Sequence, residues 1–91
     1  MNHLAKEINI SSDALVQEID NEMIILNVKT ERYFGLDSVA MDMWKRLEKH
    51  KNPQAVITEM LHGYDIDEKT LSQDIDQFLD SLNQAGLISL N

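Results

Sequence analysis

The stretch NVKTERYFGLD, residues 27–37, decides how the chain is divided between strands and helices. It begins inside the apolar segment MIILNV, residues 23–28, which is rich in β-branched side chains and predicts a strand. The polar residues 29–31 predict a corner, and RYFGL over residues 32–36 predicts a strand that returns along the first. Asp37 then gives a helix-start signal, because its carboxylate can accept hydrogen bonds from unpaired N–H groups. The stretch therefore joins a small sheet to a helical part.

A further strand is predicted before this stretch, in ALVQEI, residues 14–19, followed by a turn at Asp20 and Asn21. The result is a three-stranded antiparallel meander with residues 23–28 in the middle. The continuous apolar run of that central segment predicts a strand covered on both faces. Residues 1–13 are polar, and we expect a flexible lead-in there, followed by a single domain over residues 14–91.

Three amphipathic helices are predicted after the sheet. The first begins at Asp37 or Ser38, the second at Asn52 with proline in its first turn, and the third at Asp67. Their predicted inward residues are Val39, Ala40, Met43, Trp44, Leu47, Val56, Ile57, Met60, Leu61, Leu71, Ile75, Phe78, Leu79 and Leu82. Gly86 predicts a left-handed stop, after which the apolar tail 87–90 should pack back on the core. Strands followed by three short helices predict an α+β fold with a winged-helix-like arrangement.

The composition limits the function classes. The 91 residues carry sixteen acidic and eight basic side chains, a formal charge of -8 that repels phosphate backbones and anionic lipid. We therefore expect neither a nucleic-acid nor a membrane partner. There is no cysteine, which excludes disulfides and thiolate sites. Without a signal-peptide core or a membrane-spanning run, the sequence predicts a soluble, cytoplasmic protein.

The sequence offers little for catalysis. His3, His50 and His62 lack the spacing of metal ligands, and we expect them to face solvent. Asp76 and Asp80 lie one helical turn apart and are expected to form a solvated acidic face. No group of residues supplies an acid, a base and a nucleophile together. We therefore predict a protein that is not an enzyme, with no metal site and no cofactor.

Two alternatives remain open. Asp37-Ser38-Val39 resembles the modification site of acyl carrier proteins, in which the serine carries a phosphopantetheine arm. That family has a long helix before the serine, whereas this chain has a predicted hairpin there, so a helix cap is favoured. The winged-helix-like order also suggests a DNA-binding protein. Lys69 is the only basic residue of the segment 67–85, so we expect no specific duplex binding.

The sequence YFGLDSVAMDMWKRL, residues 33–47, resembles the signature of PqqD-like proteins, an aromatic strand followed by a helix with an M-W-x-x-L pattern. The resemblance continues through YDID at residues 64–67 and DIxxFLxxLxxxGLI at residues 74–88. It covers about residues 14–90. The sequence departs from the family at Gly35, where relatives often carry a larger residue.

The resemblance implies a RiPP recognition element. Such a module binds the leader segment of a ribosomally synthesised precursor peptide and presents the peptide to modifying enzymes. Stand-alone members serve quinone-cofactor, lasso-peptide and radical-enzyme pathways. The implied partners are a precursor peptide and a maturation enzyme such as a leader peptidase, a cyclase or a radical SAM enzyme. The implied role is that of a non-catalytic adaptor.

The strand 32–36 has only one neighbour in the predicted meander, so its outer edge is open. An extended peptide can add to such an edge as a fourth strand, and a second copy of the chain can pair with it too, giving a monomer or a weak or swapped dimer. Leaders of relatives lie between this strand and the last helix. The predicted peptide-binding residues are therefore Arg32, Tyr33, Phe34, Gly35, Leu36, Asp74, Gln77, Phe78 and Ser81. We expect at least half of Phe34, Leu36, Phe78 and Leu79 to serve the core first, and Tyr33 and Asp74 to be contacts.

Overall fold

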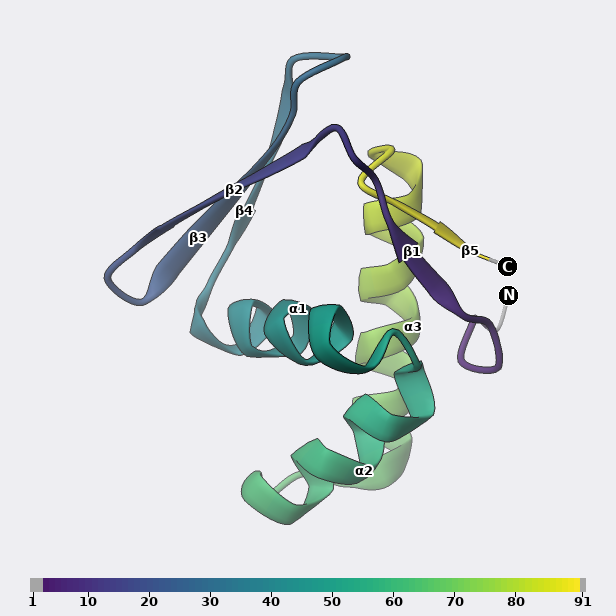
Figure 1. The fold of residues 1–91 in the computed structure, drawn as a ribbon. Helices are drawn as coiled ribbons and strands as arrows, with labels where there is room; N and C mark the ends of the chain where they lie inside the picture. The colour runs from purple at the N-terminus through teal and green to yellow at the C-terminus, as the bar shows by residue number, and fades with distance from the viewer. Residues whose placement is uncertain (1–2, 91) are drawn as a thin grey trace.

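The computed structural model describes residues 3–90, which form three helices and two small sheets (Figure 1). In chain order the elements are β1 Ile8–Ile10, β2 Ala14–Ile19, β3 Glu22–Asn27, β4 Arg32–Leu36, α1 Ser38–His50, α2 Pro53–Gly63, α3 Glu68–Gln84 and β5 Ile88–Leu90. A three-stranded antiparallel sheet followed by three helices confirms the predicted α+β fold. Within the described residues no helix combines the length and the apolar character that crossing a membrane requires.

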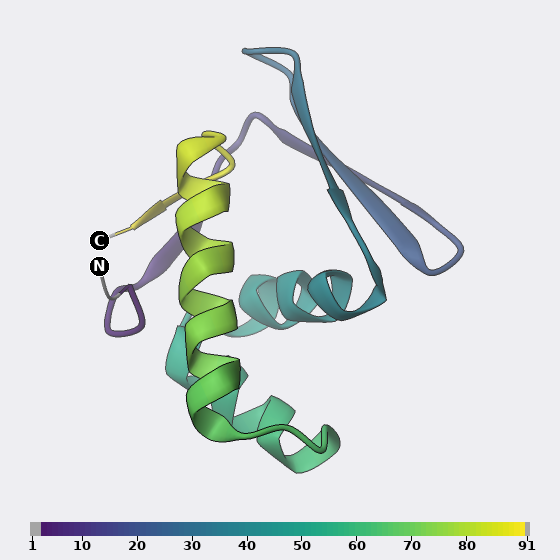
Figure 2. The same ribbon diagram turned by 180° about the vertical axis from the view of Figure 1, so that it is seen from behind.

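The larger sheet has the order β2-β3-β4, with Ile25 of the central strand opposite Val16 on one side and Phe34 on the other. Both views show the β2–β3 hairpin reaching away from the helices (Figures 1 and 2). The prediction that the central strand is covered on both faces is wrong. Met23 and Ile25 are buried on the inner face, whereas the outward-facing Ile24 is 42% exposed. Helix α1 packs on the inner face, and no segment within residues 3–90 covers the outer one.

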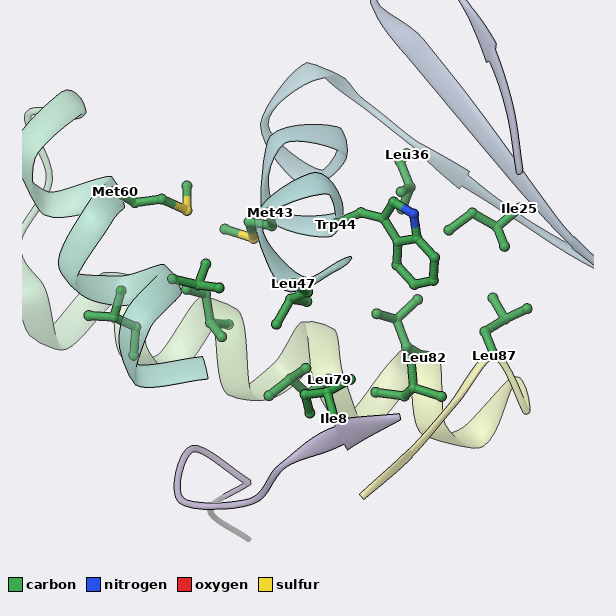
Figure 3. Packing of buried hydrophobic residues seen from close by; sticks show 14 of the residues in the cluster. Ile8, Ile25, Leu36, Met43, Trp44, Leu47, Met60, Leu79, Leu82 and Leu87 are labelled. Carbon is green, nitrogen blue, oxygen red and sulfur yellow. The ribbon is translucent and has the colours of Figure 1, made fainter. Parts of the chain in front are cut away.

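Trp44 of α1 joins the sheet to the helices. Its side chain is fully buried, and Figure 3 shows the indole beside Ile25 and Leu36 of the sheet and Leu82 of α3. Met43 and Leu47 are also buried on this side of α1, as their helical spacing predicts. Because the core is close-packed, the position of α1 fixes the position of β4 relative to α3.

The predicted helix starts are confirmed. Asp37 accepts a hydrogen bond from the backbone N–H of Ala40 at 2.9 Å, Asn52 accepts one from Gln54, and Asp67 accepts one from Thr70. Each bond satisfies a backbone donor that has no partner inside the helix. After α3, Gly86 takes a φ of 73°, the left-handed conformation predicted for a helix stop.

Strand β1 lies inside the segment that was expected to be a flexible lead-in. Ile8 is fully buried, and β1 pairs antiparallel with β5, Ile10 opposite Ile88. The backbone N–H of Ser11 also donates to the carbonyl of Leu87 at 2.9 Å. Residues 8–11 are therefore part of the packed body, and the boundary predicted at residue 14 does not separate them from it. Leu87 is buried as well, so the predicted apolar tail does pack back on the core.

His3 was expected to face solvent and is instead buried against α3. Its backbone N–H donates to Asp76 Oδ1 at 2.6 Å, and its Nε2 lies 3.3 Å from Asp80 Oδ1. The two carboxylates predicted to form a solvated acidic face thus hold the N-terminal segment on the helix. His62 is exposed, as predicted.

A polar network links α1 to α2. Arg46 contacts Asp42 and Glu59, and His50 Nε2 lies 2.6 Å from a carboxylate oxygen of Glu59. The hydrogen bond with His50, together with that from Arg46, lowers the pKa of Glu59. The hydroxyl of Tyr64 donates to Asp42 at 2.7 Å, and this bond raises the pKa of Tyr64. The network ties the segment after α2 to the first helix.

Candidate functional site

Strand β4 is an edge strand, because among the described residues only β3 pairs with it. The direction of its backbone groups follows from the ladder between β2 and β3. The N–H of Val28 donates to the carbonyl of Asp13 at 3.0 Å, which extends that ladder by one bonded position. In an antiparallel ladder, bonded and non-bonded positions alternate. The residues of β3 whose backbone groups face β2 are therefore Glu22, Ile24 and Leu26.

The remaining residues of β3, Met23, Ile25 and Asn27, direct their backbone groups toward β4. Their partners on β4 are Leu36, Phe34 and Arg32. The backbone N–H and C=O groups of Tyr33 and Gly35 consequently point away from the sheet, along its open edge. These four groups are the part of β4 that another strand can reach.

The side chains of β4 alternate between the two faces of the sheet. Leu36 is buried in the core, and Phe34 is half-buried on the same inner face. Phe34 meets Phe78 of α3 edge to face, with ring centroids 6.4 Å apart and planes at 62°. Tyr33 lies on the outer face with 74% of its surface exposed. The aromatic pair thus connects the edge strand to α3.

A hollow of about 310 Å³ lies between the start of α1 and α3, directly beyond the end of β4. We call it the α1–α3 hollow. Its lining residues are Asp37, Val39, Ala40, Met43, Asp74, Gln77, Phe78 and Ser81. All four residues predicted from the last helix are therefore brought together in one place. Of the predicted strand residues, Phe34 reaches this region through its contact with Phe78.

Val39 lines the α1–α3 hollow, although its helical spacing predicts an inward core residue. It is 43% exposed, because it lies in the first turn of α1, ahead of the buried residues Met43 and Trp44. Its helical spacing is that of a core residue, so periodicity alone cannot distinguish the two positions. The sequence signal that could have identified Val39 as a residue of the hollow is its position three residues after the end of the edge strand.

A second hollow, of about 350 Å³, lies at the same end of β4 and is lined largely from the outer face of the sheet. We call it the outer-face hollow. Its lining residues are Glu22, Met23, Ile24, Tyr33, Gly35, Leu36 and Asp37. A strand docked on the edge of β4 would therefore have a hollow near each of its two faces.

The α1–α3 hollow carries negative charge. Asp37 and Asp74 both line it, and Asp74 is exposed at its rim. With a chain charge of -8, these carboxylates favour a basic side chain over an acidic one. Across residues 3–90, no group of three or more metal-ligating side chains is placed to hold a metal ion.

The family model for coenzyme PQQ synthesis protein D (PqqD) matches residues 22–88, from β3 to β5. The chain belongs to the PqqD family. This confirms the resemblance to PqqD-like RiPP recognition elements that the sequence motifs predicted. The matched segment contains β4, α3 and the residues that line both hollows.

Two solved structures resemble this PqqD-family chain. The first is TbiB1 in complex with the TbiA(beta) leader peptide, with 32% identity, a TM-score of 0.83, and coverage of 88% of this chain and 93% of that one. The second, lasso peptide synthetase B1 complexed with the leader peptide, has 22% identity and a TM-score of 0.83, covers 91% and 98% of the two chains, and shows likeness of fold. Among curated proteins none matches the chain.

The structure also explains the residues Asp37 and Ser38, which resemble an acyl carrier modification site. The acyl carrier alternative required a long helix before the serine, whereas the structure has the sheet β2–β4 there. Asp37 is the cap of α1, and Ser38 is the exposed first residue of that helix. A helix start accounts for both residues.

Proposed function

We propose that this PqqD-family chain is a non-catalytic adaptor that binds the leader segment of a ribosomally synthesised precursor peptide. The peptide adds to β4 as a fourth strand and is thereby presented to a maturation enzyme, such as a leader peptidase, a cyclase or a radical SAM enzyme. The observation that carries this proposal is the open edge of β4, where the backbone groups of Tyr33 and Gly35 are directed outward. Both residues line the outer-face hollow, and the α1–α3 hollow lies beyond the end of the strand. TbiB1, 32% identical, is described with a leader peptide bound, which supports it.

Strand addition divides recognition between backbone and side chains. The backbone of the peptide bonds to Tyr33 and Gly35 whatever its sequence. Its side chains alternate between two rows, because successive residues of a strand point to opposite faces. The residue opposite Phe34 faces the inner side, toward Phe78 and the α1–α3 hollow, and its neighbours face the outer side.

The backbone bonds alone do not make a stable complex. Each contributes about 0.5–1.5 kcal/mol net, while every peptide residue that becomes ordered loses about 1–2 kcal/mol of backbone entropy. Apolar contacts must supply the difference. The half-buried Phe34 of β4 and Phe78 of α3 and the exposed Tyr33 of β4 offer aromatic surface for such contacts. Affinity should thus depend on a few apolar leader residues.

The proposal is tested by searching the neighbourhood of the gene for a short precursor peptide and titrating a synthetic leader made from that peptide into the protein by calorimetry. We expect saturable binding with one leader per chain, and no comparable binding of a scrambled leader of the same composition. Equal affinity for the leader and its scrambled form would contradict the proposal.

Asp74 should contribute through a basic leader residue. Asp74→Asn keeps the shape of the side chain and removes its charge, so affinity should fall a few-fold at low salt, as for an exposed ion pair worth about 0.2–1 kcal/mol. The difference from wild type should shrink as salt is raised, because exposed charges are screened. Asp65→Asn, an exposed carboxylate outside the hollow, is the matched control and should change little. A salt-independent effect, or equal effects of both variants, would refute this role.

A further inference from the structure

Neither backbone conformation nor packing requires a glycine at residue 35. Among the described glycines, Gly86 is the one with a positive φ, so Gly35 has a backbone that other residues adopt. A Cβ added at Gly35 would meet nothing within 4 Å. Glycine weakens a strand interior, and it often occurs where a ligand or another backbone approaches closely. Its presence here therefore points to something outside the domain.

The missing side chain leaves Ile24 uncovered toward the open edge. Gly35 lies directly opposite Ile24, whose other neighbour on the outer face is Gln17 of β2. In a sheet, a side chain is normally flanked by its cross-strand partners. With glycine on one side, Ile24 is 42% exposed, and the space beside it belongs to the outer-face hollow of about 350 Å³.

A strand docked on β4 would place one side chain over this space. Because the backbone groups of Gly35 point outward, the docked strand has a residue directly opposite Gly35. That residue directs its side chain to the same face of the sheet as Gly35 would, between Tyr33 and Asp37 and toward Ile24. A side chain at residue 35 would occupy the same space.

We infer that Gly35 makes the outer-face hollow a specificity-determining subsite for a bulky apolar side chain of the leader, such as leucine, isoleucine, methionine or phenylalanine. The inference rests on the proposed function and adds the class of residue selected at one position. Ile24 and the ring of Tyr33 offer apolar surface, and burying both is favourable. Glu22 and Asp37 at the rim disfavour an acidic residue.

The test is a selection of displayed random peptides on wild type, on Gly35→Val and on Gln17→Val. Gln17→Val places a valine on the same face, on the far side of Ile24 from the open edge. Wild type and Gln17→Val should enrich a bulky apolar residue at one peptide position, and Gly35→Val should lose that preference while keeping the others. A peptide selected on wild type should bind Gly35→Val on the order of tenfold more weakly, and its alanine variant at that position should bind both proteins alike.

Thermal melting separates this effect from misfolding, since Gly35→Val places a strand-forming residue where there is room and should melt no lower than wild type. The inference is overturned if Gly35→Val enriches the same bulky residue at that peptide position, or if wild type enriches a basic or acidic residue there. Neither outcome contradicts binding by strand addition. Selected peptides that fail to protect the amides of β4 from hydrogen exchange overturn the proposed function, and the subsite with it.

Discussion

Replacing Tyr33 with proline is expected to weaken leader binding severely while the domain still folds. The N–H of Tyr33 points away from β3, so proline removes no bond of the native sheet. It does remove a bond to the incoming strand, leaving a peptide carbonyl unsatisfied at a cost of about 1–3 kcal/mol, and it places a ring in the path of that strand. With loss of the aromatic contact, worth a further 1–3 kcal/mol or so, affinity should fall on the order of 100-fold or more. Calorimetry with the synthetic leader measures the loss.

Two further variants make this result specific. Tyr33→Ala removes the side chain and keeps the N–H. The difference in leader affinity between Tyr33→Ala and Tyr33→Pro therefore measures the effect of the backbone change. Val16→Pro is the matched control on β2, the other edge of the same sheet. Val16 is opposite Ile25, whose backbone groups face β4, so the N–H of Val16 also points outward. Val16→Pro should bind the leader like wild type; equal losses in the two proline variants, with circular dichroism showing folded proteins, would contradict docking on β4.

Replacing Trp44 with alanine should cost about 3–5 kcal/mol of unfolding free energy, the usual loss for a large buried aromatic side chain. Small domains are stable by only about 5–15 kcal/mol, so this variant should be close to unfolding. The indole N–H is buried and has no hydrogen-bond partner among the described residues. Trp44→Phe therefore loses no hydrogen bond and should cost clearly less.

Urea unfolding followed by far-ultraviolet circular dichroism measures both Trp44 variants without relying on the fluorescence of the replaced residue. Val28→Ala, at a half-exposed position in the β3–β4 corner, serves as the control and should change stability by less than about 0.5 kcal/mol. A Trp44→Ala protein as stable as this control would show that Trp44 does not fix the sheet against the helices.

Local signals explain which parts of the fold could be predicted. The bounds of β2 and β4 follow from turn residues and strand-forming segments, and the helix starts follow from Asp37, Asn52 and Asp67. The apolar run of β3 was misread because composition does not say what covers a strand. Ile24 has the side chain of a buried strand residue, yet no described segment lies over it.

The missed features depend on contacts between distant parts of the chain. Strand β1 has three residues, too few for its apolar-polar alternation to predict a strand, and it forms by pairing with β5 at the other end of the chain. His3 is buried for the same reason, through its bonds to α3. At the candidate site, the four residues of α3 were predicted from the family resemblance. The outward direction of the Tyr33 and Gly35 backbone groups required the register of the sheet, which the sequence does not supply.

Hydrogen exchange of single backbone amides, followed by NMR with and without the synthetic leader, tests the central claim most directly. In the free protein the amide of Phe34 should exchange slowly because it bonds to β3, whereas those of Tyr33 and Gly35 should exchange fast. A saturating concentration of leader should strongly slow the exchange of the Tyr33 and Gly35 amides and should change the exchange rate of the Phe34 amide little. If leader-induced protection and shifts gather on β2 or α2, and Tyr33 and Gly35 exchange as fast as before, the leader does not dock on β4.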